Sequence, residues 1–195
     1  MIRAVKGAWV NLEHIKNPTE KVIKLALEQA GWAIKYVNHP SEELQLLAIS
    51  KNYDALKFIK EPYNQVQEAA VKISYDALRY IKSPTNQAEL IAIHSNAGAI
   101  KFISDLDKHK ILEFLKVNFL IIKYTMKEIS KDELEKVLKE VLAREEVEEQ
   151  YIRDFLNYNT IDQSIINSID KMDFIYRYGS KRAKKIAVDE KLKMK

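Results

Sequence analysis

The sequence predicts an all-α protein: a helical-repeat solenoid built from two-helix units of about 22 residues, with a C-terminal helical cap. The first observation is that Pro18, Pro40, Pro62 and Pro84 lie 22 positions apart, and each opens a segment with the same apolar pattern. Self-similarity at a fixed period is typical of repeat arrays. The second is that the 195 residues include only four glycines and four prolines. So few helix breakers favour helices along the whole chain.

Each repeat is predicted to be a pair of short helices. Numbering each copy from its proline as position 0, position 1 is Thr19, Ser41, Tyr63 or Thr85, and serine and threonine are good N-cap residues. Apolar residues at positions 4, 7 and 8 form a stripe on a first helix, and those at positions 15, 16 and 19 form one on a second helix. The next proline disfavours helical geometry at the residue before it. Helices this short must stack on their neighbours, and the recurrent alanine at positions 8 and 15 predicts a close approach.

The repeat pattern extends beyond the four prolines in both directions. Residues 4–15 match the second half of a copy, and residues 106–124 match a degenerate fifth copy in which Asp107 falls on the N-cap position. We therefore expect an α-helical repeat array over residues 1–127 and a separate helical region with a basic tail over residues 128–195.

The C-terminal region carries several local helix signals. Ser130 and Glu133 have the spacing of a capping box, followed by an apolar stripe at helical spacing. Thr160 and Asp170 are candidate caps for two further short helices. Gly179 is expected to end one helix as a C′ glycine, and Ser180 to cap a last basic helix.

The repeats resemble a known group of sequences. Residues 26–37, ALEQAGWAIKYV, and their counterparts in the later copies resemble the short helical-hairpin repeats of unknown function that are found in phages and giant viruses. That group repeats the pattern A-x-x-x-x-G/N-x-A-L-x-Y-I/V, and the resemblance covers residues 18 to about 127. It implies a phage-type origin and a helical-repeat fold, with no activity attached.

The composition excludes some classes of site. The chain has no cysteine, so disulfides and zinc–thiolate sites are excluded. Its longest run of aliphatic and phenylalanine residues, at 119–122, is far too short to span a bilayer. We expect a cytoplasmic protein with no membrane association, located in the host cytoplasm if the protein is viral.

The candidate binding residues of the array lie at position 17, which is basic in every copy and is expected to face solvent. Stacking would align these residues as a basic ladder, formed by Lys35, Lys57, Arg79, Lys101 and Lys123. On a helical wheel, Tyr53 and Tyr75 share a face with Lys57 and Arg79. The ladder could bind a protein or a nucleic-acid backbone, or it could be a solvated face, because Asp54 and Asp76 precede two of its members at salt-bridge spacing. The aromatic residues at position 18 are expected to be buried.

The C-terminal tail is a second candidate surface. Residues 128–150 carry nine acids and four bases, whereas residues 171–195 carry nine bases and three acids. The basic tail could dock on the acidic helix of its own chain or of a second copy, remain solvated, or bind an external polyanion. The residues concerned are Lys181, Arg182, Lys184 and Lys185.

The sequence contains no recognisable catalytic motif. The four histidines fall at four different repeat positions without metal-ligand spacing, and no phosphate loop or nucleophile elbow is present. We therefore predict no catalytic residue, cofactor or metal. The expected function is a non-enzymatic protein–protein interaction module that binds a host or virion protein. The alternatives are a nucleic-acid binder that uses the basic ladder and the tail, and a homo-oligomer with a structural role.

Overall fold

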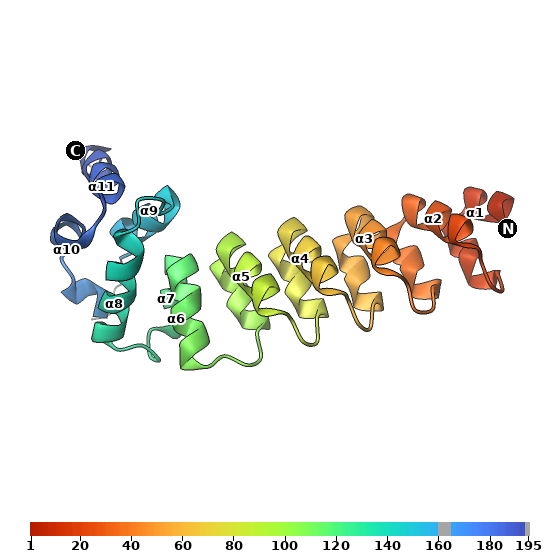
Figure 1. Ribbon diagram of the computed structural model, residues 1–195, viewed down its shortest axis with the longest axis horizontal. Coiled ribbons are helices and arrows are strands. Elements are labelled where there is room, and N and C mark those ends of the chain that lie inside the picture. Colours follow the sequence, from red (N-terminus) through yellow and green to blue (C-terminus); the bar gives the residue numbers. More distant parts are fainter. Residues whose placement is uncertain (160–164, 194–195) are drawn as a thin grey trace. The chain divides into compact units, whose positions relative to one another are not determined.

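The computed structural model describes residues 1–159 and 165–193, and these contain helices and no strand. The chain divides into two compact units, Met1–Ile103 and Ser104–Lys195. In the first unit, α-helices alternate with short 3₁₀ helices at the 22-residue period (Figure 1). Its elements are α1 (Ile2–Gly7), η1 (Trp9–His14), α2 (Glu20–Gln29), η2 (Gly31–Tyr36), α3 (Glu42–Lys51), η3 (Tyr53–Phe58), α4 (Asn64–Ile73), η4 (Tyr75–Tyr80), α5 (Asn86–Ser95) and η5 (Ala97–Phe102).

The all-α helical-repeat fold is confirmed, and the α-helices begin where the sequence predicts. Each first helix starts directly after position 1, and the Thr85 hydroxyl accepts a hydrogen bond from the backbone N–H of Ala88 at 3.1 Å. Ser41 caps α3 in the same way with a longer bond of 3.5 Å to Leu44. Helices α2 to α5 stand side by side, each packed on the next (Figure 1). The period therefore produces one hairpin per copy.

The second element of each hairpin is a 3₁₀ helix rather than the expected α-helix. Position 12 is extended in every full copy, as at Asn52 with φ −145° and ψ 105°, and the chain is extended again at position 19. Only six residues lie between these two points. A 3₁₀ helix advances about 2.0 Å per residue against about 1.5 Å for an α-helix, so it returns the chain to the next proline with fewer residues. Asn17 and His39, which precede prolines, adopt left-handed φ values of 50° and 48°.

Fully buried alanines form the tight contacts of the first unit. The alanines at positions 8 and 15 of every full copy have no exposed surface, as predicted: Ala26, Ala48, Ala70, Ala92, Ala33, Ala55, Ala77 and Ala99. The apolar stripe of the first helix differs from the predicted one, because positions 4, 5, 8 and 9 are buried while position 7 is half-buried. A helix clamped between two neighbouring hairpins buries a wider face than one that packs on a single layer.

Buried glutamines at position 5 join successive loops, a feature that the sequence reasoning did not predict. The Gln67 Nε2 donates to the carbonyl of Pro62 at 3.1 Å, and its Oε1 accepts from the backbone N–H of Thr85 in the next loop at 2.9 Å. Gln45 makes the same two bonds, to Pro40 at 3.1 Å and from Tyr63 at 3.3 Å. Both side chains are almost fully buried, so each amide is a polar bridge between one copy and the next.

The second unit combines the degenerate copy with the C-terminal helices. Its elements are α6 (Lys108–Val117), η6 (Phe119–Ile121), α7 (Ile122–Thr125), α8 (Lys131–Leu142), α9 (Glu149–Asn157), η7 (Ile165–Ser168), α10 (Lys171–Tyr178) and α11 (Lys181–Lys193). The repeat pattern places a domain boundary after residue 127, whereas the compact units divide after Ile103. The reason is that α6 packs on α8 and that the Tyr151 hydroxyl of α9 donates to the Leu115 carbonyl at 3.0 Å.

Several local signals in this unit are confirmed. Ser130 and Glu133 form the predicted capping box at the start of α8, and Asp170 caps α10 by accepting from the N–H of Asp173. Thr160 lies outside the described residues. Gly179 follows α10 but is extended, with φ −74°, so it is not the left-handed C′ glycine that was expected. A Cβ there would lie 2.6 Å from the Ile175 carbonyl oxygen, so close approach explains this glycine.

We predict that Gly31→Ala destabilises the first unit. An added Cβ would lie 2.0 Å from the carbonyl oxygen of Ala48 and 3.2 Å from the backbone nitrogen of Asn52, and neither backbone atom can move aside freely. The expected loss is roughly 1–3 kcal/mol of unfolding free energy. Both tryptophans of the chain, Trp9 and Trp32, lie in this unit, so tryptophan fluorescence during denaturant unfolding measures it. Gly7→Ala is the control, because no atom lies within 4 Å of its added Cβ. Equal stability of the two variants would contradict the prediction.

We also predict that Gln67→Met lowers the stability of the first unit. Methionine keeps the shape of the side chain but leaves the Pro62 carbonyl and the Thr85 N–H without their bridge. The expected cost is about 1–3 kcal/mol in the same unfolding measurement. Gln65→Met on the exposed side of the same helix should stay within about 0.5 kcal/mol of the native protein. A neutral Gln67→Met variant would show that the amide bridge is not needed.

Candidate cation–aromatic surface

The basic residues at position 17 lie on the exposed side of the 3₁₀ helices. Lys35, Lys57, Arg79 and Lys101 are all exposed, as the sequence predicts. A 3₁₀ helix has three residues per turn, so the side chains at positions 14 and 17 lie one above the other. Because the four 3₁₀ helices follow one another along the first unit, the four cations form a row along one edge of it. In this unit the basic ladder is therefore a structural feature.

Aromatic rings lie between these cations. The Lys35 ammonium is 4.6 Å from the ring centroid of Tyr36 and 5.6 Å from that of Trp9. Lys57 lies 5.1 Å from the Phe58 ring and 6.0 Å from the Trp32 ring. These distances are within the range of cation–π attraction. The cations and rings of neighbouring copies thus make one continuous surface.

We call this surface the cation–aromatic strip. Arg79 extends it to the fourth copy, because its guanidinium carbon lies 4.9 Å from the ring centroid of Phe102. The strip is defined by the following residues: Trp9, Trp32, Lys35, Tyr36, Asp54, Lys57, Phe58, Asp76, Arg79, Tyr80, Lys101 and Phe102.

Two carboxylates orient the central cations of the strip. Asp54 forms an ion pair with Lys57 at 2.9 Å, and Asp76 pairs with Arg79 at 3.0 Å, both at the predicted spacing of three residues. Asp54 also accepts a hydrogen bond from the Trp32 indole of the preceding copy at 2.7 Å. Desolvation by itself would raise the pKa of Asp54, but the hydrogen bonds from Lys57 and Trp32 outweigh it and lower the pKa below 3.8. The hydrogen bond to Asp54 in turn raises the pKa of Lys57.

The aromatic partners of the cations differ from the predicted ones. Tyr53 and Tyr75 are half-buried at position 13, and at 120° per residue they lie a third of a turn away from the cation four residues later. The rings that contact the cations are instead those at position 18 and the two tryptophans. The expectation that position 18 is buried was wrong, since Phe58 is 39% exposed and Tyr36, Tyr80 and Phe102 are half-buried. The fifth cation, Lys123, is exposed on α7 and belongs to the second unit.

The basic tail forms α11 and docks within its own unit. Its buried residues are Ala183, Ile186 and Ala187, and α11 packs on α9 and α10. The Lys181 N–H donates to the Glu145 carboxylate at 3.3 Å, and Arg182 Nε donates to the Val147 carbonyl at 3.1 Å. The tail therefore docks within its own unit, but its apolar face packs on α9 and α10, and only hydrogen bonds to Glu145 and Val147 reach the segment 128–150.

The basic side chains of α11 point mainly to solvent. Lys181, Arg182 and Lys185 are exposed, and Lys184 lies 5.8 Å from the centroid of the exposed Tyr176 ring. The ion pair between α9 and α11 has the opposite polarity to the one expected, because Arg153 of α9 pairs with Glu190 of the tail helix. Opposite net charges of two segments therefore did not identify which side chains pair.

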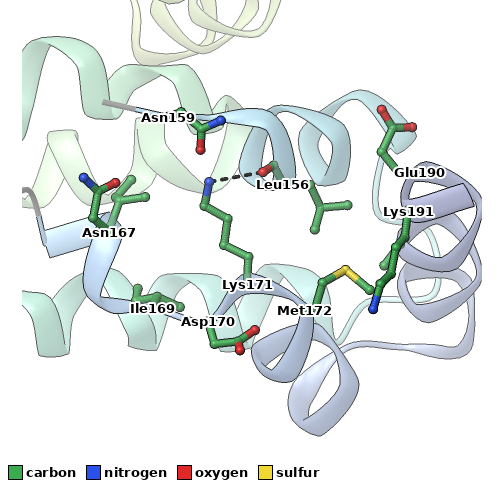
Figure 2. Close-up of a pocket in the computed structure, with 11 residues that line it drawn as sticks. Leu156, Asn159, Asn167, Ile169, Asp170, Lys171, Met172, Glu190 and Lys191 are labelled. Carbon is green, nitrogen blue, oxygen red and sulfur yellow. Dashed lines mark hydrogen bonds between the residues drawn. The ribbon is translucent and has the colours of Figure 1, made fainter. Parts of the chain in front are cut away.

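The second unit also contains a cavity of about 520 Å³ between α9, η7, α10 and α11 (Figure 2). Lys171 points across it and donates to the Leu156 carbonyl at 3.1 Å and to the Tyr158 carbonyl. Burial lowers the pKa of this ammonium group. Lys171 thus provides hydrogen-bond donors for carbonyl groups at the C-terminal end of α9. Asp170 caps α10, and Glu190 forms an ion pair with Arg153. These three charged groups are thus held in structural contacts, and we do not assign the cavity a chemical role.

Two kinds of site are absent from residues 1–159 and 165–193. Over these ranges, no helix combines the length and apolarity needed to cross a membrane. Within the same ranges, no three histidine, aspartate or glutamate side chains converge in a way that could hold a metal ion. Comparison of the chain with protein-family models, curated proteins and solved structures finds no match.

We predict that the indole resonance of Trp32 titrates with Asp54. The hydrogen bond between them couples the indole N–H shift to the charge of the carboxylate, whose pKa lies below 3.8. Because this pKa is depressed, the stabilising contribution of Asp54 is present above pH 3.8 and is lost as the pH falls through the folded-state value. Two-dimensional NMR over this acid range measures the shift, and Lys57→Ala should move the midpoint upward. The Trp9 indole is the internal comparison, and an identical titration of both indoles would contradict the assignment.

Proposed function

We propose that the chain is a non-enzymatic protein-binding module and that the cation–aromatic strip is its binding surface. The observation that supports the proposal is the alternation of exposed cations with exposed or half-buried rings along four successive 3₁₀ helices. Tryptophan, tyrosine and arginine are the residue types enriched at binding hot spots. Trp32 and Phe58 are exposed by 38% and 39%, so their rings are accessible to a ligand.

The scaffold beneath the strip supports a binding role. The 3₁₀ helices are held by buried alanines and by hydrogen bonds between copies, such as that from the Gly31 N–H to the Asn52 side chain at 2.9 Å. A surface that is already ordered loses little conformational entropy when a partner binds. The resemblance to viral hairpin repeats adds the proposal that the chain is phage-encoded and that the partner is a host or virion protein.

A nucleic-acid backbone is the second candidate ligand. Interleaved cations and rings are also the means by which proteins bind single strands. Against this, Asp54 and Asp76 already pair with two of the four cations, and a nucleic-acid-binding surface is expected to carry a larger basic surplus. We therefore favour a protein partner for this surface.

We predict that reversing two central charges of the strip abolishes partner capture. Lys57→Glu with Arg79→Glu places two acids among the rings, whereas Lys51→Glu with Lys72→Glu makes the same charge change at exposed positions of α3 and α4. Both variants should keep the native circular dichroism spectrum, and the strip variant should unfold at a slightly lower midpoint because it loses the Asp54 and Asp76 ion pairs. A partner retained from lysate by the native protein should remain bound to the α3/α4 variant and be lost from the strip variant.

Two results would overturn the proposal. The first is a partner that binds the native protein and the strip variant equally well. The second is strip-dependent binding of single-stranded DNA or RNA, with steep salt dependence, in the absence of any retained protein.

A further inference from the structure

We propose that the cation–aromatic strip binds an extended acidic segment in the polyproline-II conformation, with an acidic side chain at every third residue. The inference rests on the proposed function, because it names the ligand of the same surface. It is argued from the spacing of the strip, its charge and the exposure of its rings.

The spacing of the strip follows from the packing of the hairpins. Helices in contact lie about 8–10 Å apart, and successive cations belong to successive hairpins. The guanidinium of Arg79 is 4.9 Å from the Phe102 ring of the next copy, and Lys57 is 5.1 Å from the Phe58 ring. The Arg79–Phe102 contact joins two copies, whereas Lys57 and Phe58 belong to the same copy. A ligand that meets every cation must repeat its charge at the same interval.

Of the regular peptide conformations, polyproline II fits this interval. It has three residues per turn and rises about 3.1 Å per residue, so residues i, i+3 and i+6 lie about 9 Å apart along one edge. A β-strand repeats a face every two residues, or about 7 Å, and an α-helix repeats every 5.4 Å or so. Both would fall out of register with the hairpins within two or three copies.

The charge of the strip favours an acidic ligand. Four cations lie along it and two carboxylates lie beside them, so the strip carries a net charge of +2. Asp54 and Asp76 occupy one side of Lys57 and Arg79. A lysine ammonium carries three hydrogen-bond donors and an arginine guanidinium five, so each cation can bind a ligand carboxylate while it keeps its aspartate.

The rings account for the residues between the acids. Aromatic grooves recognise proline-rich segments because the preformed polyproline-II helix loses little entropy on binding and its proline rings pack on aromatic faces. Trp32 and Phe58, whose rings both contact Lys57, are 38% and 39% exposed. Prolines at the two positions between successive acids would lie against these rings, while the acids meet the cations.

Fluorescence anisotropy with two peptides of identical composition tests the register. The first peptide is (Glu-Pro-Pro)₄, and the second is (Glu-Glu-Pro-Pro-Pro-Pro)₂, which carries the same four acids and eight prolines in clusters. We expect the evenly spaced peptide to bind about tenfold more tightly at low salt and to lose most of its affinity for the Lys57→Glu, Arg79→Glu variant. The Lys51→Glu, Lys72→Glu variant should bind it as the native protein does. Single-stranded oligothymidylate of similar length is the competing ligand.

The outcomes separate this inference from the proposed function. Equal affinity for the two peptides would overturn the register, because charge alone would then explain binding. Absence of peptide binding, together with strip-dependent capture of a protein, would overturn the inference and leave the proposed function standing. Tighter strip-dependent binding of oligothymidylate would overturn both. If the strip variant still prefers the evenly spaced peptide to the clustered one by the same factor, the inference would also be overturned, because another surface would then bind the peptide.

Discussion

The close approach of neighbouring hairpins through buried alanines is the constraint on which the first unit depends. Positions 8 and 15 carry a methyl group in every full copy, and none of these side chains has exposed surface. This close packing brings the Arg79 side chain of one copy against the Phe102 ring of the next. It also brings the Trp32 indole within hydrogen-bond distance of Asp54 in the following copy. The continuity of the surface strip therefore has its origin in small residues that lie beneath it.

Polar bridges supplement this apolar contact on the loop side of the hairpins. Burial of the loop carbonyls and N–H groups would be unfavourable without partners, and Gln45 and Gln67 provide them from inside the helices. The two sets of contacts act on different edges of the same hairpin. The apolar contacts fix how near the copies come, and the amides fix where each loop lies relative to the following one.

Features that depend on local signals could be predicted from the sequence. The prolines, the N-cap residues and the alanines gave the period, the starts of the α-helices and the tight contacts. The 3₁₀ helices could not be distinguished from α-helices, because apolar residues at positions 15, 16 and 19 fit both. The Asp54–Lys57 pair was still predicted correctly, since residues three apart are neighbours in either helix, whereas the predicted Tyr53–Lys57 neighbourhood requires α-helical geometry.

Features that depend on contacts between distant residues could not be predicted in the same way. A glutamine at position 5 gives no sign in one copy that its amide is buried against the next loop. In the second unit, the capping box of Ser130 was evident from four consecutive residues, but the docking of α11 on α9 was not. Net charge made docking one of three alternatives for the tail and did not identify Glu190 and Arg153 as the pair.

The glutamine bridges have a consequence for how the array can change in evolution. Gln67 uses one partner from its own loop and one from the following loop, and Gln45 does the same one copy earlier. These two hairpins present the same donor and acceptor to their successors, so a copy that carries this glutamine can be duplicated without leaving a mismatched junction, whereas Ile23 and Glu89 stand at position 5 of the other two full copies. Gain or loss of a copy would lengthen or shorten the row of cations by one interval, so copy number sets the length of this surface and of the segment that we propose it binds.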